Sequence, residues 1–561
     1  MAFLSARNSR GRKYWSICES RRVNGKPRNI PLVYLGTAET LLNKFSSSDS
    51  SIKIKSFAHG HVYSLFKLAS ELNIANIIDK HIPNKKNGKQ IVRNKISVGT
   101  SILLAAIGRA CHPTSKMGWY NWCKNTSLEH IMKTSLKSLD SQHFWDQMDF
   151  VPKEAIPLIE EEIVKNTLEL SGVKLGTLLY DTTNFFTFID SQNQHCDLPR
   201  RGKNKQKRYD LRQIGLALAV TREDQIPLFH KTYHGNKNDF TCFKDIFQNL
   251  FDRLKSVAKE LSDITIVFDK GNNSKENFKK IDDKKELYYV ASLVSAYFKE
   301  LICEANKNFE TIIIEDEDIP CFRTKKEVWG KERTLLVTIS NQLKEGQIQG
   351  ICQQLAKKYK ILDELKQQLE SPKKIKKFSE QDLYARLKKI IKGQFIEEIL
   401  KYELIKLDTN DMSFSYFIDS TAFEYLKENI LGRKIFVTNR HEWSNEEIIL
   451  AYRGQSKVEY TFRNLKNPYH LAIRPQFHWT DQKIEVHILI CLIGYILSAL
   501  IHSKARKEVS YRNNMNNLLD DLSEIRLAYV MSKKSKTVVF QLEDMPEYLM
   551  RLVDLFKISP T

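Results

Sequence analysis

Four short apolar runs, each bounded by polar turns, lie in the middle part of the sequence. They cover residues 176–181, 213–220, 227–233 and 264–269, and a helical spacing of apolar positions lies between the last two, at about 239–260. Apolar runs of this length are typical of strands that are buried on both faces of a sheet. The pattern predicts three strands, a helix and a further strand, and so indicates an α/β core with a mixed sheet flanked by helices.

The segment before this core shows other patterns. Short β-like runs flank the pair Asn24 and Gly25, which is a strong signal for a hairpin turn. A Ser-rich stretch, residues 46–51, predicts a linker. Residues 56–170 then carry apolar positions at helical spacing. We therefore expect an N-terminal β-hairpin followed by a helical region.

The segment after the fourth strand does not continue the strand and helix patterns of the core. Residues 296–414 mix short β-like pieces with a Lys-rich helical stretch from 343 to 407. That stretch has the composition of a solvated helix face, with nucleic-acid binding as the alternative. The core resumes in the apolar run 434–438, so residues 296–414 are predicted to be an insertion.

Length and charge narrow the class of protein. With 561 residues, the chain is long enough for three or four units. Lys and Arg outnumber Asp and Glu by 88 to 67, which gives a net charge of +21. Such an excess favours a polyanionic partner such as nucleic acid. AT-biased coding also enriches Lys, Asn and Ile, so the charge alone does not decide the partner.

The cysteines and the longest apolar stretch argue against two other classes. The nine cysteines are scattered and form no CxxC pair, which argues against a zinc site of the usual spacing. Their odd number and the absence of a secretory signal favour a reducing cytosol. Residues 484–501 are apolar but include Glu485 and His487, and the uninterrupted run is shorter than the roughly 20 residues that a bilayer requires. We expect a buried core helix rather than a membrane span.

Two of the four apolar runs end in an aspartate. Asp181 and Asp269 would both lie at the carboxyl ends of strands, where ligand sites form in open α/β sheets. Two carboxylates in one place repel each other unless a cation lies between them or one is protonated. Carboxylate oxygens are also the ligands that Mg²⁺ prefers. The alternative is that each aspartate caps the following turn or helix.

A third acid lies on a predicted helix over residues 445–467. Ser444 and Glu447 form a capping-box pattern at its start. At 100° per residue, one narrow stripe of this helix holds six residues that should face the sheet. They are Ile448, Tyr452, Gln455, Glu459, Phe462 and Lys466. A carboxylate on a largely apolar face needs a metal or a basic partner, and Lys466 is a candidate for the latter. The alternative is a plain helical ion pair between Glu459 and Arg463.

These residues resemble a known family, the DDE transposases of bacterial insertion sequences. In its IS-four-like group the third acid lies in a Tyr-x2-Arg-x3-Glu-x6-Lys signature, the YREK type. Tyr452, Glu459 and Lys466 fall on the signature positions, whereas Gln455 stands where the signature has Arg. Arg453 or Arg463 could supply the missing charge. Residues 180–183, 268–272, 440–444 and 478–481 also resemble the family, and the likeness extends from the N-terminal hairpin to about residue 505.

The resemblance implies a fold and an activity. The family has an RNase-H-like catalytic core, often interrupted by an insertion before the Glu-bearing helix, and three strands, a helix and a further strand are the opening order of that fold. Its members cut DNA at the ends of a mobile element and join the freed 3′-OH to target DNA. The chemistry uses two divalent ions, Mg²⁺ or Mn²⁺, roughly 3.5–4 Å apart. Asp181 is expected to bridge the two ions, with Asp269 and Glu459 each completing one.

The resemblance also implies partners and a place of action. The expected partner is double-stranded DNA, both the transposon ends and the target, bound by at least a homodimer when two ends are paired. The expected location is the cytoplasm of a prokaryote, at the nucleoid when DNA is bound. The predicted regions are a hairpin region over 1–55, a helical DNA-binding region over 56–170, the core over 171–295 and 415–505, the insertion domain over 296–414, and a C-terminal tail region over 506–561.

Several cations are candidates for DNA contacts. Lys466 and Tyr452 are expected at phosphates near the scissile bond, with Arg453 and Arg463 beside them. A compact basic loop between the first two strands is predicted to bind phosphate, which dominates DNA affinity, and a mobile surface turn is the alternative. Its cations are Arg200, Arg201, Lys203, Lys205, Lys207 and Arg208.

Aromatic residues and two further functions complete the sequence-based expectations. Trp329, Trp443 and Trp479 are candidates for stacking on an unpaired base, although a core aromatic is the simpler interpretation for each. The competing functions are an RNase-H-like nuclease that cuts without joining, and an inactive, transposase-derived DNA-binding protein.

Overall fold

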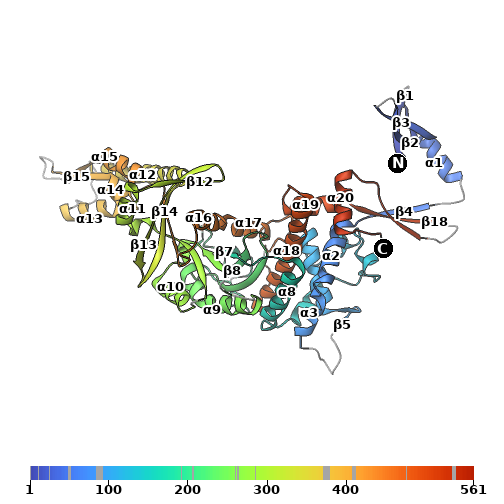
Figure 1. The fold of residues 1–561 in the computed structure, drawn as a ribbon, viewed down its shortest axis with the longest axis horizontal. Coiled ribbons are helices and arrows are strands. Elements are labelled where there is room, and N and C mark those ends of the chain that lie inside the picture. Colours follow the sequence, from blue (N-terminus) through green and yellow to red (C-terminus); the bar gives the residue numbers. More distant parts are fainter. Residues whose placement is uncertain are drawn as a thin grey trace. The chain divides into compact units, whose positions relative to one another are not determined.

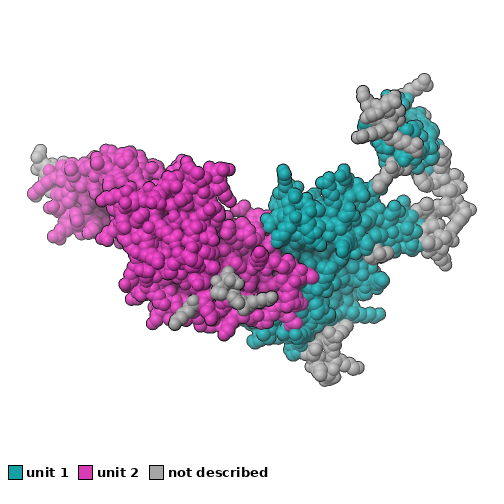
Figure 2. All heavy atoms as spheres, in the orientation of Figure 1, with its two compact units in different colours: residues 1–159, 465–473, 485–561 teal, residues 160–464, 474–484 magenta. Residues whose placement is uncertain are grey.

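The chain forms two compact units in the computed structural model. Unit 1 comprises residues 1–159, 465–473 and 485–561, and unit 2 comprises residues 160–464 and 474–484 (Figure 2). The structure describes residues 2–9, 12–23, 26–47, 52–83, 92–190, 192–204, 207–258, 261, 264–284, 286–370, 379–406, 412–474, 477–532 and 538–560. The predicted turn residues Asn24 and Gly25, the predicted linker residues 48–51 and Lys205 lie outside the described residues.

Unit 2 is built on a nine-stranded sheet with the strand order β12-β13-β14-β17-β11-β10-β7-β8-β9 (Figure 1). The strands are β7 (Thr177–Phe186), β8 (Gln213–Thr221), β9 (Pro227–His234), β10 (Thr265–Phe268), β11 (Tyr288–Leu293), β12 (Glu310–Ile314), β13 (Glu317–Val328), β14 (Lys331–Ile339) and β17 (Arg433–Thr438). β10 runs parallel to β7 and β11, and all other neighbours are antiparallel. The predicted mixed α/β architecture is therefore confirmed.

One face of this sheet is covered by α9 (Asp239–Val257). The ring of Phe243 on α9 lies 5.1 Å from Tyr180 of β7 and 5.2 Å from Phe268 of β10. The Asn238 side chain accepts a hydrogen bond from the Thr241 amide and so caps the helix. All nine residues of β8 are buried, as its unbroken apolar run predicted. The alternation of side chains along the strands then leaves Leu179 and Asp181 for the opposite face.

A buried ion cluster ties the edge strand β9 to two helices. Glu160, in α8 (Ala155–Ser171), accepts hydrogen bonds from His230 of β9 at 2.5 Å and from Arg253 of α9 at 2.7 Å. Each of the three side chains is only 5% exposed. Burial alone would raise the pKa of Glu160, but the charges of His230 and Arg253 outweigh it and lower that pKa. The cluster keeps a buried carboxylate ionised and fully paired.

The predicted insertion contributes to the same sheet rather than standing wholly apart. β12, β13 and β14 extend the sheet beyond β17, the strand in which the core was expected to resume. The remainder forms helices and a two-stranded sheet. These elements are α11 (Lys299–Lys307), α12 (Asn341–Glu370), α13 (Glu380–Ile391), α14 (Ile396–Ile399), β15 (Leu400–Lys406), β16 (Met412–Ile418) and α15 (Ser420–Asn429).

Unit 1 combines segments from both ends of the chain. Its N-terminal part is a three-stranded sheet rather than the predicted two-stranded hairpin, because β1 (Ala2–Ser9) pairs with β2 (Arg12–Val23) beside β3 (Lys26–Thr37). The helix α1 (Ala38–Ser47) covers the start of the predicted linker. Its other main elements are β4 (Ile52–Ala58), α2 (Gly60–Glu71), α3 (Ile74–His81), α4 (Val98–Cys111), α7 (Ser141–Asp149), α19 (Met515–Ser523), β18 (Arg526–Ser532), β19 (Val538–Leu542) and α20 (Glu547–Phe556).

Pairing between distant segments closes this unit. β18 pairs with β4, so residues more than 450 positions apart share one sheet. The long helix α18 (Asp481–Val509) is apolar and long enough to cross a membrane by composition alone, yet 94% of its most apolar window is buried. That burial is typical of the core helix expected from the sequence.

Candidate active site

Asp181 and Asp269 lie on neighbouring parallel strands. Tyr180 of β7 pairs with Phe268 of β10, so the two aspartates follow a paired position. Neighbouring strands are about 4.8 Å apart, and paired residues point to the same face. Since Tyr180 and Phe268 face α9, both aspartates point to the opposite side of the sheet. β7 continues to Phe186, so the prediction that its strand ends at Asp181 is wrong, although β10 does end just before Asp269.

The hydroxyl of Tyr452 connects this pair of acids to the helix α16 (Asn445–Arg453). It donates a hydrogen bond to Asp269 Oδ1 at 2.8 Å and lies 2.7 Å from the hydroxyl of Ser292 on β11. Ser292 Oγ is itself 3.3 Å from the same carboxylate oxygen. Asp269 makes no side-chain cap to the helical turn that follows it, which removes the capping alternative for this residue.

Burial and two negative charges raise the pKa of Tyr452. Burial raises its pKa most, the negative charge of Asp269 raises it further, and Asp181 adds a smaller increase. A phenol in this setting stays protonated and acts as a hydrogen-bond donor. The sequence assigned Tyr452 to a DNA phosphate, whereas in the structure its hydroxyl is engaged by Asp269 and Ser292.

The predicted Glu-bearing helix consists of two helices that meet at Gly454. The capping box of Ser444 and Glu447 at its start is confirmed. The predicted single helix over 445–467 is wrong, since α16 ends at Arg453 and α17 covers Gln455–Leu465. A Cβ atom on Gly454 would lie 3.2 Å from the Leu179 side chain of β7, so the absence of a side chain allows close approach.

Gln455 fastens α17 to the same strand. Its Nε2 donates to the carbonyl oxygen of Tyr180 at 3.0 Å, one residue before Asp181. Gln455 is the residue that departs from the family signature. In this chain it holds the helix beside the first aspartate, a role that depends on contacts the sequence does not display.

Glu459 follows Gln455 on the same stripe, about 6 Å farther along the helix axis. Ile448 and Phe462 of this stripe are buried, but Glu459 is exposed, so its predicted position on a buried apolar face is wrong. Among the described residues its carboxylate forms no ion pair with Arg463, the alternative that the spacing suggested. Within the same residues, no three His, Cys, Asp or Glu side chains already lie close enough to hold a metal. The two aspartates and Glu459 offer the oxygen donors that Mg²⁺ prefers.

Lys434 is a site residue that the sequence interpretation missed. It is half-buried at the start of β17, with its Nζ 5.9 Å from the centre of the Tyr452 ring. Burial lowers its pKa most, Arg453 and Lys270 lower it further, and the charge of Asp269 opposes them. From the sequence only the place of Lys434 in a strand could be predicted, because its interaction with Asp269 depends on the order of the strands in the sheet.

The other predicted DNA contacts are distributed unevenly. Arg453 is bound by Glu317 at 2.6 Å and lies 3.9 Å from Glu315. Arg463 is exposed on α17. Lys466 lies beyond the end of α17, is half-buried and belongs to unit 1.

The basic loop is more constrained and less cationic than its sequence suggested. Arg208 forms a two-bond ion pair with Asp210 at 2.8 and 2.9 Å, which lowers the pKa of Asp210 to about 2, and Arg200 pairs with Asp197. Asn204 accepts a hydrogen bond from the Arg208 amide at 2.9 Å and so closes the loop. Arg201, Lys203 and Lys207 are exposed.

The loop begins well away from the two aspartates. Arg200 bridges to Gln213, which pairs with Phe186, five residues beyond Asp181. At about 3.4 Å per residue this is roughly 17 Å along β7. A phosphate bound by the loop would therefore belong to flanking DNA, and that contact stays a prediction.

The three tryptophans differ in their surroundings. Trp329 packs on Phe278 at 4.5 Å, and Trp443 lies 4.8 Å from the Arg440 guanidinium, and both are half-buried. Trp479 is 58% exposed, with His195 at 6.3 Å. Exposure therefore leaves Trp479 as the most accessible of the three for stacking.

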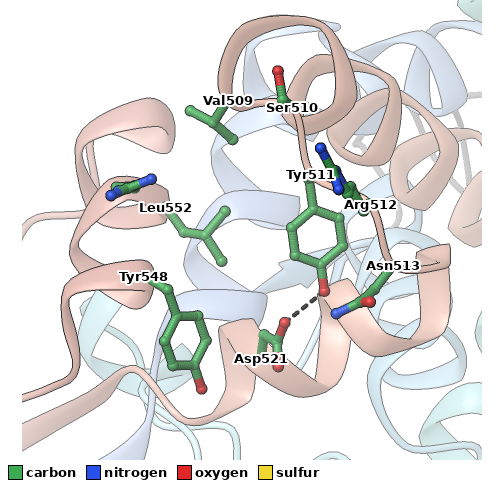
Figure 3. A pocket seen from close by; sticks show the side chains of 9 residues that line it. Val509, Ser510, Tyr511, Arg512, Asn513, Asp521, Tyr548 and Leu552 are labelled. Carbon is green, nitrogen blue, oxygen red and sulfur yellow. Dashed lines mark hydrogen bonds between the residues drawn. The ribbon is translucent and has the colours of Figure 1, made fainter.

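Unit 1 contains a cavity of about 410 Å³ between the end of α18 and α20 (Figure 3). Tyr511, Arg512, Tyr548 and Arg551 line it, and Tyr511 donates to Asp521 at 2.5 Å. None of the predicted site residues lines this cavity.

Comparison with known proteins assigns the family. The model of the transposase DDE domain matches residues 186–497, more than half of the chain, and this range includes Asp269 and Glu459. The chain belongs to the transposase DDE domain family. The match begins five residues after Asp181, so the place of that residue depends on the strand register alone.

A solved structure similar to this member of the family is the cryo-EM structure of the piggyBac transposase synaptic complex with hairpin DNA. It is 9% identical, covers 82% of this chain and 78% of its own, and has a TM-score of 0.35. With this score it supports no inference about the site. No curated protein matches the chain.

Proposed function

We propose that this chain is the transposase of a bacterial insertion sequence, with Asp181, Asp269 and Glu459 as its catalytic acids. The proposal depends on one observation above all. Asp181 and Asp269 follow paired positions of neighbouring strands and face the helix pair that carries Glu459. The family membership supports a reaction on DNA, and β7, β8, β9, α9 and β10 follow one another in the order that the sequence predicted.

The three carboxylates would hold two divalent ions, Mg²⁺ or Mn²⁺. Such ions, when bound, activate the attacking oxygen and stabilise the leaving oxygen of an in-line displacement at phosphorus. Asp181, Asp269 and Glu459 would supply the carboxylate oxygens that hold these ions, with Asp181 as the ligand that both would share. Because Glu459 is exposed and makes no ion pair among the described residues, its carboxylate is available for this role.

The surrounding residues prepare the site. Tyr452 and Ser292 both engage Oδ1 of Asp269 and so fix the orientation of the carboxylate. The charge of the half-buried Lys434 interacts with that of Asp269 and so offsets part of the repulsion between the two acids. In cleavage, water forms the new bond to phosphorus, its proton passes to solvent, and the 3′-oxygen leaves. In joining, the freed 3′-OH is the nucleophile and a 3′-oxygen of the target strand leaves.

The finer parts of the proposal follow from the resemblance to the IS-four-like group. The substrate is double-stranded DNA, namely the ends of the element and the target. Two copies of the chain act together on paired ends, in the cytoplasm of a prokaryote. Flanking DNA with short inverted repeats around the gene would supply the natural substrate.

The test is cleavage of DNA that contains those repeats. Asp181→Asn, Asp269→Asn and Glu459→Gln should each abolish Mg²⁺- or Mn²⁺-dependent nicking and leave DNA binding within about twofold. Glu446→Gln, an exposed acid in the first turn of α16, is the matched control and should nick normally. Nicking that survives in one of the three variants removes that residue from the site. Failure of the parent to join pre-cut ends would instead identify a nuclease.

A further inference from the structure

The tip of the β12–β13 hairpin consists of four consecutive acids, residues 315–318, in a chain of net charge +21. Ile314 pairs with Glu317, so Glu315 and Asp316 form a two-residue turn. Both have positive φ, 51° and 64°, as tight hairpin turns require. The backbone of a short turn therefore fixes the position of these acids.

Two of the four carboxylates bind Arg453. Glu317 lies 2.6 Å from its guanidinium and Glu315 lies 3.9 Å from it. Asp316 and Asp318, the alternate members of the run, form no ion pair with Arg453 in the described part of the chain. The hairpin tip thus presents one pair of acids to Arg453 and leaves the other pair to solvent.

Arg453 belongs to the surroundings of the candidate active site. It follows Tyr452, whose hydroxyl binds Asp269, and its charge lowers the pKa of the half-buried Lys434. A guanidinium here suits a phosphate near the cut. Carboxylate and phosphate bind arginine through the same arrangement of oxygens, so Glu317 occupies the place that a phosphate would take.

We propose that Glu315 and Glu317 compete with DNA for Arg453 and so determine which DNA the chain binds. This inference rests on the proposed function, in which Arg453 contacts a DNA phosphate. A chain of this charge attracts any DNA. DNA that makes many contacts displaces the two glutamates, whereas DNA held by few phosphates does so less readily. All three side chains are at least 38% exposed, so each pair lowers affinity by no more than about fivefold.

The experiment compares two double variants of the full chain that remove the same charge. In E315Q/E317Q the acids that hold Arg453 are neutralised, and in D316N/D318N their neighbours on the same hairpin are. Binding to a random-sequence duplex is measured by fluorescence anisotropy over a range of salt concentrations, without divalent ions. The same pairs are also made in an R453Q background.

The expected result is a two- to fivefold lower Kd for E315Q/E317Q, a clearly smaller change for D316N/D318N, and no gain in the R453Q background. Equal gains in the two double variants would show a general effect of net charge and overturn the proposal. No gain for E315Q/E317Q, while R453Q alone weakens binding, would overturn it and leave the proposed function intact. If R453Q alone does not weaken binding, the assignment of Arg453 to DNA fails, and the inference fails with it.

Discussion

The variant Tyr452→Phe, which lacks the side-chain hydroxyl, tests whether Tyr452 orients Asp269 or binds a DNA phosphate. In Tyr452→Phe the ring remains packed 4.9 Å from Phe436, so the fold should be kept. What is lost is the 2.8 Å hydrogen bond to Asp269. If the hydroxyl orients a metal-binding carboxylate, the variant should need more Mg²⁺ for the same rate of nicking. If it binds a DNA phosphate, as the sequence suggested, DNA affinity without metal should fall instead.

The structure gives the size of the expected effect. A hydrogen bond to a charged group contributes about 1.5–3 kcal/mol. Ser292 stays 3.3 Å from the same carboxylate oxygen and compensates in part, so the lower end applies. About 1.4 kcal/mol corresponds to a tenfold change in an equilibrium constant. We therefore expect the half-saturating Mg²⁺ concentration to rise about tenfold, with metal-free DNA binding unchanged.

The assay is a Mg²⁺ titration of nicking, combined with metal-free DNA binding and with direct Mn²⁺ binding measured by electron paramagnetic resonance. Tyr425→Phe, which removes an exposed hydroxyl from α15, is the control and should match the parent. Unchanged Mg²⁺ dependence together with weaker metal-free DNA binding would refute the positioning role and restore the phosphate contact.

Two further predictions concern stability. Glu160→Gln removes the carboxylate that binds the buried side chains of His230 and Arg253 and leaves Arg253 only the half-buried Glu161 at 3.8 Å, so thermal unfolding should reveal a loss of about 3 kcal/mol, and a loss below 1 kcal/mol would contradict the pairing. His59 and His61 are buried in unit 1, and burial lowers their pKa values to about 4 and about 3. The unfolded chain takes up protons at these two rings near pH 6.5, whereas the folded chain does so only near pH 4 and pH 3. The free energy of unfolding therefore falls as the pH is lowered from 7.5 to 5.5, by about 1 kcal/mol per ring. A melting temperature independent of pH over this range would contradict the burial.

Strands β8, β9 and β10 of the central sheet could be predicted because most of their residues are buried. β8 and β10 are buried throughout, so the sequence shows them as unbroken apolar runs. The extension of β7 beyond Asp181 could not be predicted in this way. Its residues 182–186 include Thr182, Thr183 and Asn184, which lie half-buried next to β8 and carry no apolar signal.

The sequence predicted only those parts of the candidate site that depend on residues close together in the chain. Asp181 and Asp269 stand beside the ends of apolar runs, and that pattern is local. Ser292 and Lys434 reach Asp269 through the positions of β11 and β17 in the sheet, which link residues 23 or more positions apart. The exposure of Glu459 was mispredicted because a stripe analysis assumes that the sheet continues beneath the helix. β10 ends at Phe268, so the sheet is narrower beyond the aspartates.

The arrangement around Asp269 is poorly explained by stability alone. Two half-buried carboxylates that face the same side of adjacent strands repel each other, and a neutral residue at either position would remove that cost. The chain keeps both acids, and Asp269 accepts hydrogen bonds from the hydroxyls of Tyr452 and Ser292 and interacts with the charge of Lys434. These contacts lower the cost without neutralising both carboxylates. The remaining negative potential favours a divalent cation, and Glu459, exposed on the helix that Gln455 fastens beside Asp181, is the proposed third ligand.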